Sequence, residues 1–254
     1  MTALQMLGVL LAGLAAGTIN TVVGSGTLIS FPTLLAFGVP PVTANVSNTI
    51  GLTPGSLSGA WGYRRELAGQ RARAMRLGAG SLLGGFAGAV LLLWLPSSAF
   101  DAIVPVLIAL GVLLVVLGPR IQGLVGARAA RRGGLPETGA RWVWSAVTGV
   151  GVYGGYFGAA QGVLLMAILG IGVDDTLQRH NAMKNVLAFV ANGVAAVVFI
   201  TVAHVNWTAA GLVALGSVIG GQVGSTIGRR LPATVLRVMI VVVGLVALAV
   251  LLLR

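Results

Sequence analysis

The chain has 254 residues, of which 57% are apolar and 8% are charged, and its mean hydropathy is +0.99. Soluble proteins carry about 25% charged residues, so this composition excludes a soluble globular domain. A membrane-spanning helix needs about 20 apolar residues, which leaves room for about ten crossings. The chain has no cysteine, two histidines and five acidic residues. Thiolate chemistry is therefore excluded, and we expect neither a protein metal centre nor a cofactor.

The net charge of +11 raises the question of a nucleic-acid partner, and the placement of the basic residues decides it. Twelve of the sixteen basic residues fall in the short segments 62–76, 119–141 and 229–232. Such clusters between apolar segments are typical of cytoplasmic loops of membrane proteins. We therefore expect a multi-pass protein of the cytoplasmic membrane, in contact with the lipid bilayer and with no nucleic acid. The first apolar stretch lacks a basic leader, which argues against a cleaved signal peptide.

Apolar runs separated by Gly, Pro and Arg predict ten helical segments. They lie near 3–19, 27–37, 42–62, 74–95, 100–118, 142–157, 161–172, 182–203, 208–228 and 233–253. At about 1.5 Å per residue, the second and the seventh are too short to cross a bilayer, and each follows a glycine-rich break. We predict an all-α polytopic membrane protein with these short helices, broken or re-entrant, at its centre.

Two halves of the chain, 1–118 and 142–254, repeat one another, and the loop 119–141 connects them. Residues 80–88 read GSLLGGFAG and residues 216–224 read GSVIGGQVG, which is a shift of 136 positions. Each half therefore forms one transmembrane repeat of about five helical segments.

The charges of equivalent loops are opposite in the two halves. The basic loop 62–76 has the uncharged counterpart 204–207, whereas the loop 96–101 has no basic residue and its counterpart, 229–232, has two arginines. Because basic loops face the cytoplasm, the repeats are predicted to be inverted relative to one another in the membrane. The connecting loop is then cytoplasmic, and both termini lie outside.

Interrupted helices at matching positions of inverted halves point to the binding site of a transporter. The breaks at 24–26 and 158–162 are expected to bring the N-termini of the two short helices together near the midplane. Helix N-termini carry unpaired N–H groups and a partial positive charge, so they favour an anion. The alternative is that these glycines only allow helices to pack closely.

Polar residues cluster around these breaks and on the following helix of each half. We predict that the substrate site consists of Asn20, Gly24, Ser25, Gly26, Thr27, Asn45, Asn48, Tyr156, Gln161, Gly162, Asn181, Lys184 and Asn185. Polar side chains inside a membrane are costly unless they serve a ligand, a cavity or a neighbouring helix. Hydrogen bonding between helices is the alternative for any single asparagine. Lys184 either balances an anionic substrate or extends to the cytoplasmic surface, and the charged residues at 174, 175 and 179 favour the surface.

The segment 17–67 resembles the sulfite exporter TauE/SafE family of bacterial permeases. The likeness rests on the segment from Asn20 to Gly26, on the short helix with Pro32, on Ala44-Asn45 and on Tyr63-Arg64-Arg65. It extends more weakly through the second half, where Ala159-Ala160-Gln161 stands in place of Ser25-Gly26-Thr27. The resemblance implies a permease that moves anions such as sulfite, sulfonates and sulfoacetate without ATP.

The expected function is a secondary transporter that moves a small sulfur-containing anion, such as sulfite or an organosulfonate, by alternating access. The chain has no GxxxxGK[ST] nucleotide motif, and the predicted segments place no arginine near the midplane. An anion channel with the same site is the alternative. An intramembrane hydrolase with Ser25 as nucleophile and His180 or His204 as base is disfavoured, because nothing places a histidine beside Ser25. A coupling ion and a homodimer stay open.

Overall fold

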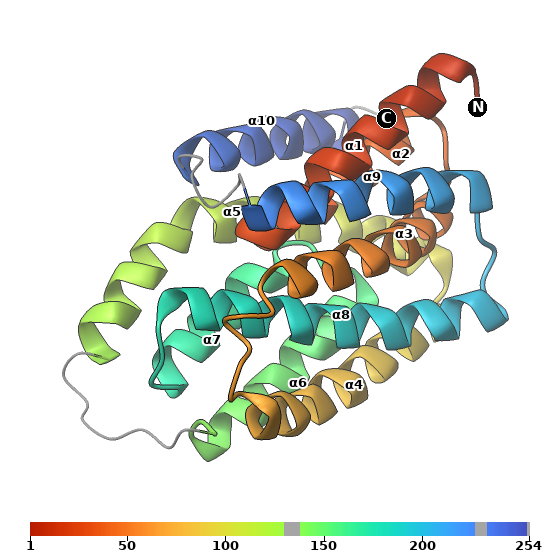
Figure 1. Cartoon of the computed structure of the whole chain (residues 1–254). Coiled ribbons are helices and arrows are strands. Elements are labelled where there is room, and N and C mark those ends of the chain that lie inside the picture. Colours follow the sequence, from red (N-terminus) through yellow and green to blue (C-terminus); the bar gives the residue numbers. More distant parts are fainter. Residues whose placement is uncertain (130–137, 227–232, 253–254) are drawn as a thin grey trace.

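Ten α-helices make up most of the part of the chain that the computed structural model describes, which is residues 1–129, 138–226 and 233–252, and this part has no strand (Figure 1). The helices are α1 (Ala3–Val22), α2 (Thr27–Ala36), α3 (Pro41–Gly62), α4 (Arg71–Trp94), α5 (Ser97–Ala129), α6 (Arg141–Tyr156), α7 (Gln161–Gly172), α8 (Leu177–Val202), α9 (Trp207–Thr226) and α10 (Ala233–Leu252). The prediction of an all-α fold is confirmed.

Several helices begin or end beyond their apolar runs. The largest difference is in α5, which continues to Ala129, so the first eleven residues of the predicted loop 119–141 are helical. Its content of Arg, Gly and Ala predicts a loop, but Ala and Arg are good helix formers, so this part of the prediction is wrong. Similarly, α8 begins at Leu177, where the Thr176 side chain caps it by accepting the Arg179 N–H. The remaining loop segments 130–137 and 229–232 lie outside the described residues.

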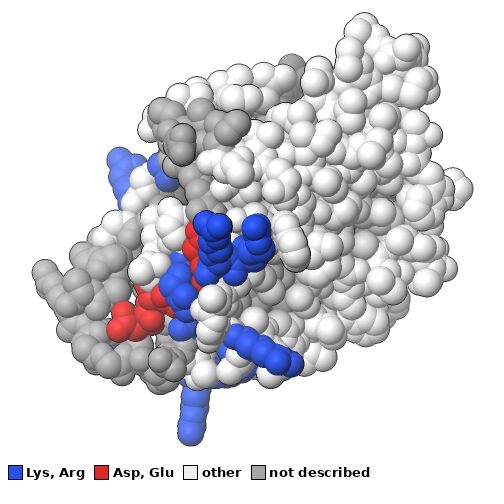
Figure 2. Space-filling view, viewed as in Figure 1, with Lys and Arg blue, Asp and Glu red and all other residues white. Residues whose placement is uncertain are grey.

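The surface of the molecule is apolar over most of its length. Among the described residues, five helices are long and apolar enough to cross a membrane: α1, α4, α8, α9 and the Ser97–Arg120 part of α5. Large side chains such as Leu83, Phe86, Leu215 and Ile219 are about half exposed, and Figure 2 shows one face on which charged residues gather at a single end. Apolar surface on this scale is the surface of a protein in contact with lipid.

The short helices α2 and α7 turn back after the break that precedes them. The end of α2 lies against the start of α1, because a Cβ at Gly8 would meet the Phe37 ring at 3.0 Å. The end of α7 lies against the start of α6, where the Ala140 N–H donates to the Gly172 oxygen at 2.9 Å. Both pairs, α1–α2 and α6–α7, are therefore hairpins whose tips lie inside the protein.

Glycines allow the long helices to pack with their backbones in contact. A Cβ at Gly17 in α1 would overlap the backbone of Ser217 in α9, and one at Gly84 in α4 would overlap the carbonyl of Thr148 in α6. Small residues are what permits membrane helices to approach this closely. In Figure 1, α1 (red) lies along α9 (blue).

When each helix of α1–α5 is matched with its counterpart in α6–α10, every major pair of packed helices matches another packed pair or itself. The pair α1–α9 corresponds to α6–α4, α3–α9 to α8–α4, and α5–α7 to α10–α2, whereas α3–α8 and α5–α10 correspond to themselves. The helices α1, α3 and α9 run in one direction. Gly13 and Gly17 of α1 face Val213 and Ser217 of α9 in that order, and Gly51 and Gly55 of α3 face the same two residues in the same order. Their counterparts α6, α8 and α4 begin at the opposite, charged end, where Arg76 donates to Gly139 and Arg73 to Asp175. Inverted repeats require this opposition.

Two substitutions in α6 test the importance of backbone contact. Gly155→Ala places a Cβ on the carbonyl of Gly85 in α4, and Gly149→Ala places one in open space. We expect Gly155→Ala to destabilise the protein by about 1–3 kcal/mol through overpacking. Gly149→Ala should be neutral or stabilising, because alanine favours a helix over glycine by about 1 kcal/mol. Thermal unfolding in detergent measures both, and equal melting temperatures for the two variants would contradict the packing described.

Candidate substrate site

The tips of the two hairpins touch at their glycines. The Gly162 N–H donates to the Gly24 oxygen at 2.9 Å, and a Cβ at Gly24 would overlap the Cα of Gly162. Gly24 also has a φ of +91°, a conformation that side chains with a Cβ rarely adopt. This contact brings the end of α1, the start of α2 and the start of α7 to one point, as expected from the sequence.

The end of α1 is capped by Lys184 of α8. The Lys184 ammonium donates to the Asn20 oxygen at 3.0 Å and to the Thr21 oxygen at 2.9 Å, and the side chain is 1% exposed. These carbonyls belong to the last turn of α1, whose end carries a partial negative charge. The expectation that Lys184 extends to the surface was wrong, because the α1 carbonyls give its charge partners inside the protein. The amides of Asn181 and Asn185 donate to Thr21 as well, at 3.2 Å and 3.4 Å.

The end of α6 meets α3 in the corresponding way, but without a lysine. The Asn45 amide donates to the Tyr156 oxygen at 2.9 Å, which matches the bond from Asn181 to Thr21. Asn48, three residues further on the same face of α3, stands 136 positions before Lys184. Its side chain is 1% exposed, and neither its nitrogen nor its oxygen has a hydrogen-bond partner.

Several other predicted residues carry buried polar atoms without a partner. Within the described part of the chain, such atoms occur in eight residues, and six of these belong to the predicted site: Ser25, Asn45, Asn48, Tyr156, Gln161 and Asn181. More than 90% of buried polar groups in proteins have a partner. The N–H groups of Gly26 and Thr27 at the start of α2 also find no acceptor among the described residues. The unpaired donors and acceptors therefore concentrate where the hairpins meet.

Two predicted residues have partners within their own half. Asn20 is half-buried and donates to the Ser56 hydroxyl at 3.2 Å, so Ser56 belongs to the surroundings of the site although the sequence did not single it out. Gly26 packs inside its own hairpin, since a Cβ there would overlap the Ala16 carbonyl.

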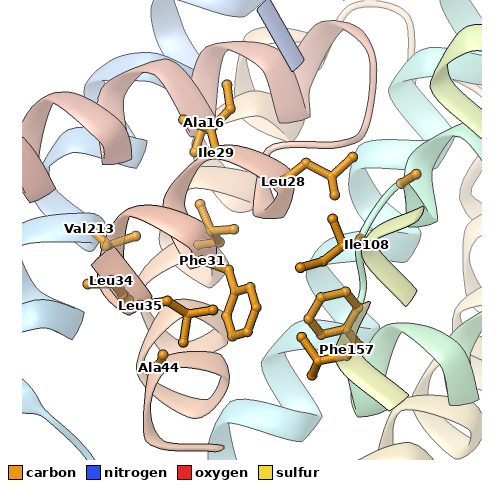
Figure 3. Close-up of a cluster of buried hydrophobic side chains, with 14 of the residues drawn as sticks. Ala16, Leu28, Ile29, Phe31, Leu34, Leu35, Ala44, Ile108, Phe157 and Val213 are labelled. Carbon is orange, nitrogen blue, oxygen red and sulfur yellow. The ribbon is translucent and has the colours of Figure 1, made fainter. Parts of the chain in front are cut away.

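An aromatic contact beside the tips was missed from the sequence. Phe31 of α2 points at Phe157, the residue after α6, with ring centroids 5.1 Å apart and planes at 90° (Figure 3). Phe100 of α5 lies 6.1 Å from Phe157. Edge-to-face pairs of this kind stabilise beyond their apolar area. The signal available was a phenylalanine close to each break, at Phe31 and Phe157.

The opposite, charged end of the molecule is held by ion pairs. Asp175, in the turn before α8, accepts from Arg73 of α4 at 2.5 Å and from Arg179 at 2.7 Å. Burial raises the pKa of Asp175, but the hydrogen bonds from the two arginines outweigh burial and hold its pKa below the ordinary value of 3.8. Arg179 also donates to the Ala68 oxygen, so the network ties the α3–α4 loop to the start of α8. The charged side chains of this end are visible in Figure 2.

Comparison with known proteins places this architecture in a family. The family described as "Sulfite exporter TauE/SafE" matches residues 9–251. The chain belongs to this TauE/SafE family. It is therefore a multi-pass membrane transporter and not an enzyme, and no solved structure matches it.

The relatives of this TauE/SafE protein cover almost its whole length. The probable membrane transporter protein YfcA of Escherichia coli (strain K12) is 27% identical over 95% of this chain and 87% of its own. The probable membrane transporter protein ORF9 of Sinorhizobium sp is 30% identical over 94% of this chain and 88% of its own. A probable membrane transporter protein of Haemophilus influenzae is 23% identical over 91% of this chain and 88% of its own.

Two glycines of positive φ allow the contribution of the tip contact to stability to be measured separately from that of backbone strain. Gly24→Ala adds both strain and a clash with Gly162, whereas Gly38→Ala, at a φ of +82°, adds strain alone because nothing lies within 4 Å. We expect Gly38→Ala to cost about 1 kcal/mol and Gly24→Ala to cost at least 2 kcal/mol more. Thermal unfolding checks this difference, and similar losses would show that the tips do not need to touch.

The ion pairs of Asp175 predict a pH dependence. A carboxyl whose pKa is lowered in the folded state stabilises the protein above its unfolded pKa, and loses this contribution as the pH falls through the folded value. At about pH 7 we expect Asp175→Asn to cost about 1.5–3 kcal/mol, because hydrogen bonds to charged groups are lost. The difference in melting temperature between wild type and variant should shrink once the pH falls below 3.8. A difference that is the same at all pH values would contradict the role of the carboxylate.

Proposed function

We propose that this TauE/SafE protein is a secondary transporter that moves a small sulfur-containing anion, such as sulfite or an organosulfonate, across the cytoplasmic membrane by alternating access. The observation that supports it most is the set of buried, unpaired polar atoms at the meeting hairpin tips. A ligand with several acceptor oxygens can bond to all the donors among them at once. In a dry protein interior without a ligand, these donors stay unpaired, which is costly.

The proposed site binds the anion with neutral donors and helix ends. The start of α2 offers the N–H groups of Gly26 and Thr27, and Ser25, Tyr156 and Gln161 offer unpaired side-chain donors. Lys184 already bonds to the α1 carbonyls. A buried arginine would hold an oxyanion strongly, but a transporter must also release its substrate, and distributed neutral donors bind more weakly.

The proposed mechanism uses the two halves, 1–118 and 142–254, as inverted repeats. The opposite directions of α1 and α6, and the exchange of packing pairs between the halves, support this assignment. In such transporters the halves rock around a fixed central site, so that it opens to each side in turn. The clustering of arginines at one end supports a cytoplasmic location for that end.

Tyr156 allows a test with little risk to the fold. Its hydroxyl has no partner, so Tyr156→Phe removes no hydrogen bond of the protein itself and should leave the melting temperature nearly unchanged. If the hydroxyl contacts the anion, the loss of about 1.5 kcal/mol or more raises Kd by about tenfold or more. The measurement is a thermal-shift titration with sulfite, sulfate, thiosulfate, sulfoacetate and taurine, followed by uptake of the bound anion into proteoliposomes.

The matched control is Ser81→Ala, which removes an unpaired buried hydroxyl outside the predicted site. It should leave Kd unchanged. Equal Kd values for wild type and Tyr156→Phe would remove the hydroxyl from the site, and no stabilisation by any of the anions would contradict the proposed substrate class. Flux that rises linearly with concentration, without saturation, would indicate a channel. An anion affinity lost in Lys184→Ala alone would show that a fixed cation holds the substrate.

A further inference from the structure

Four helix ends lie at the centre of the protein, and they differ in sign. The N-termini of α2 and α7 carry partial positive charge, and the C-termini of α1 and α6 carry partial negative charge. An anion at the proposed site uses the positive ends. The two negative ends need donors or cations of their own, since helix ends are rarely buried without compensation.

The negative end of α1 has its cation. The Lys184 ammonium lies within 3.0 Å of both the Asn20 and the Thr21 oxygen. It is the single lysine of the sequence. Its ammonium is bound by helix-end carbonyls as a free monovalent cation would be, but it is attached to the chain.

The negative end of α6 has no such group. Among the described residues, the one side-chain donor to its last turn is the neutral Asn45 amide, which bonds to Tyr156. At the position equivalent to Lys184, α3 has Asn48, whose amide is fully buried and unpaired. The Asn45 oxygen, on the same amide that touches the Tyr156 carbonyl, is unpaired too. At the positions of α3 that correspond to Asn181 and Lys184 of α8, the chain therefore has neutral amides with unpaired, buried oxygens.

We propose that the end of α6 binds a small monovalent cation through the side-chain oxygens of Asn45 and Asn48 and the carbonyls of the last turn of α6. This cation takes the place that Lys184 occupies at the end of α1. Its role as the coupling ion rests on the proposed transport function, since a cation beside the anion site offsets the charge of the substrate. Broken-helix transporters hold Na⁺ at helix C-terminal ends in this manner.

The chemistry of the site favours a monovalent over a divalent ion. Amide and carbonyl oxygens are hard ligands that suit Na⁺, but Ca²⁺ sites in proteins draw on carboxylates. The five acidic residues of the chain, at 66, 101, 137, 174 and 175, lie outside α3 and α6. Neutral ligands together with the partial charge of one helix end balance a single positive charge better than two.

The test is the melting temperature of the full chain in detergent, titrated with NaCl against choline chloride at constant ionic strength and constant chloride. For the wild type we expect a rise of about 3–6 °C at ten times Kd, which then continues with the logarithm of the Na⁺ concentration. Asn48→Leu should abolish the response. Asn48→Lys should give a melting temperature that no longer depends on Na⁺, because the attached ammonium occupies the site. Ser81→Ala should respond like the wild type.

A second variant keeps the proposal falsifiable if Asn48→Leu fails to fold. Asn48→Asp has nearly the same shape and adds a negative charge, so the Kd for Na⁺ should fall by about tenfold or more. An unchanged Kd in Asn48→Asp, or equal melting of the wild type in Na⁺ and choline, would overturn the cation site. The anion titration tests the proposed function separately: stabilisation by an anion without any response to Na⁺ refutes the cation site alone, and the converse refutes the substrate class alone.

Discussion

The hydrogen bond from Gly162 to Gly24 is the point on which the rest of the structure depends. It joins the two halves at their hairpin tips, where four helix ends meet inside an apolar environment. Helix ends left unpaired in such surroundings cost several kcal/mol each. The neighbouring helices α3 and α8 accordingly place their amides and one ammonium against these ends. The polar centre thus follows from bringing two interrupted helices together in a membrane.

Different interactions hold the protein together on the two sides of this centre. Towards the end of α2 and the start of α3, the rings of Phe31, Phe100 and Phe157 pack against one another. Towards the charged end, Asp175 links Arg73 and Arg179. The strength of the ion pairs depends on pH and salt, whereas that of the aromatic packing does not. The two sides of the centre therefore respond differently to solution conditions.

Features set by neighbouring residues, such as helix bounds, could be predicted from the sequence. Features set by distant residues, such as the partners of a buried side chain, could not. The short helix 161–172 was predicted with its observed bounds, because a glycine-rich break and a charged turn delimit an apolar run. The buried position of Lys184 was not predicted, because its partners Asn20 and Thr21 are more than 160 positions away. Nearby charges at 174 and 175 favoured the surface. Of the predicted site residues, Asn45 and Asn181 lie at the helix ends, but only the structure separates their paired atoms from their unpaired ones.

The capping of α1 by Lys184 has a consequence for biosynthesis. The residues that satisfy the end of α1 are synthesised long after it, since Asn20 and Lys184 are 164 positions apart. Until α8 is inserted, the first half holds bare carbonyls in the bilayer, where each is costly. A fragment that ends after the first half should then be a substrate for quality-control proteases, although its apolar content is ample for insertion.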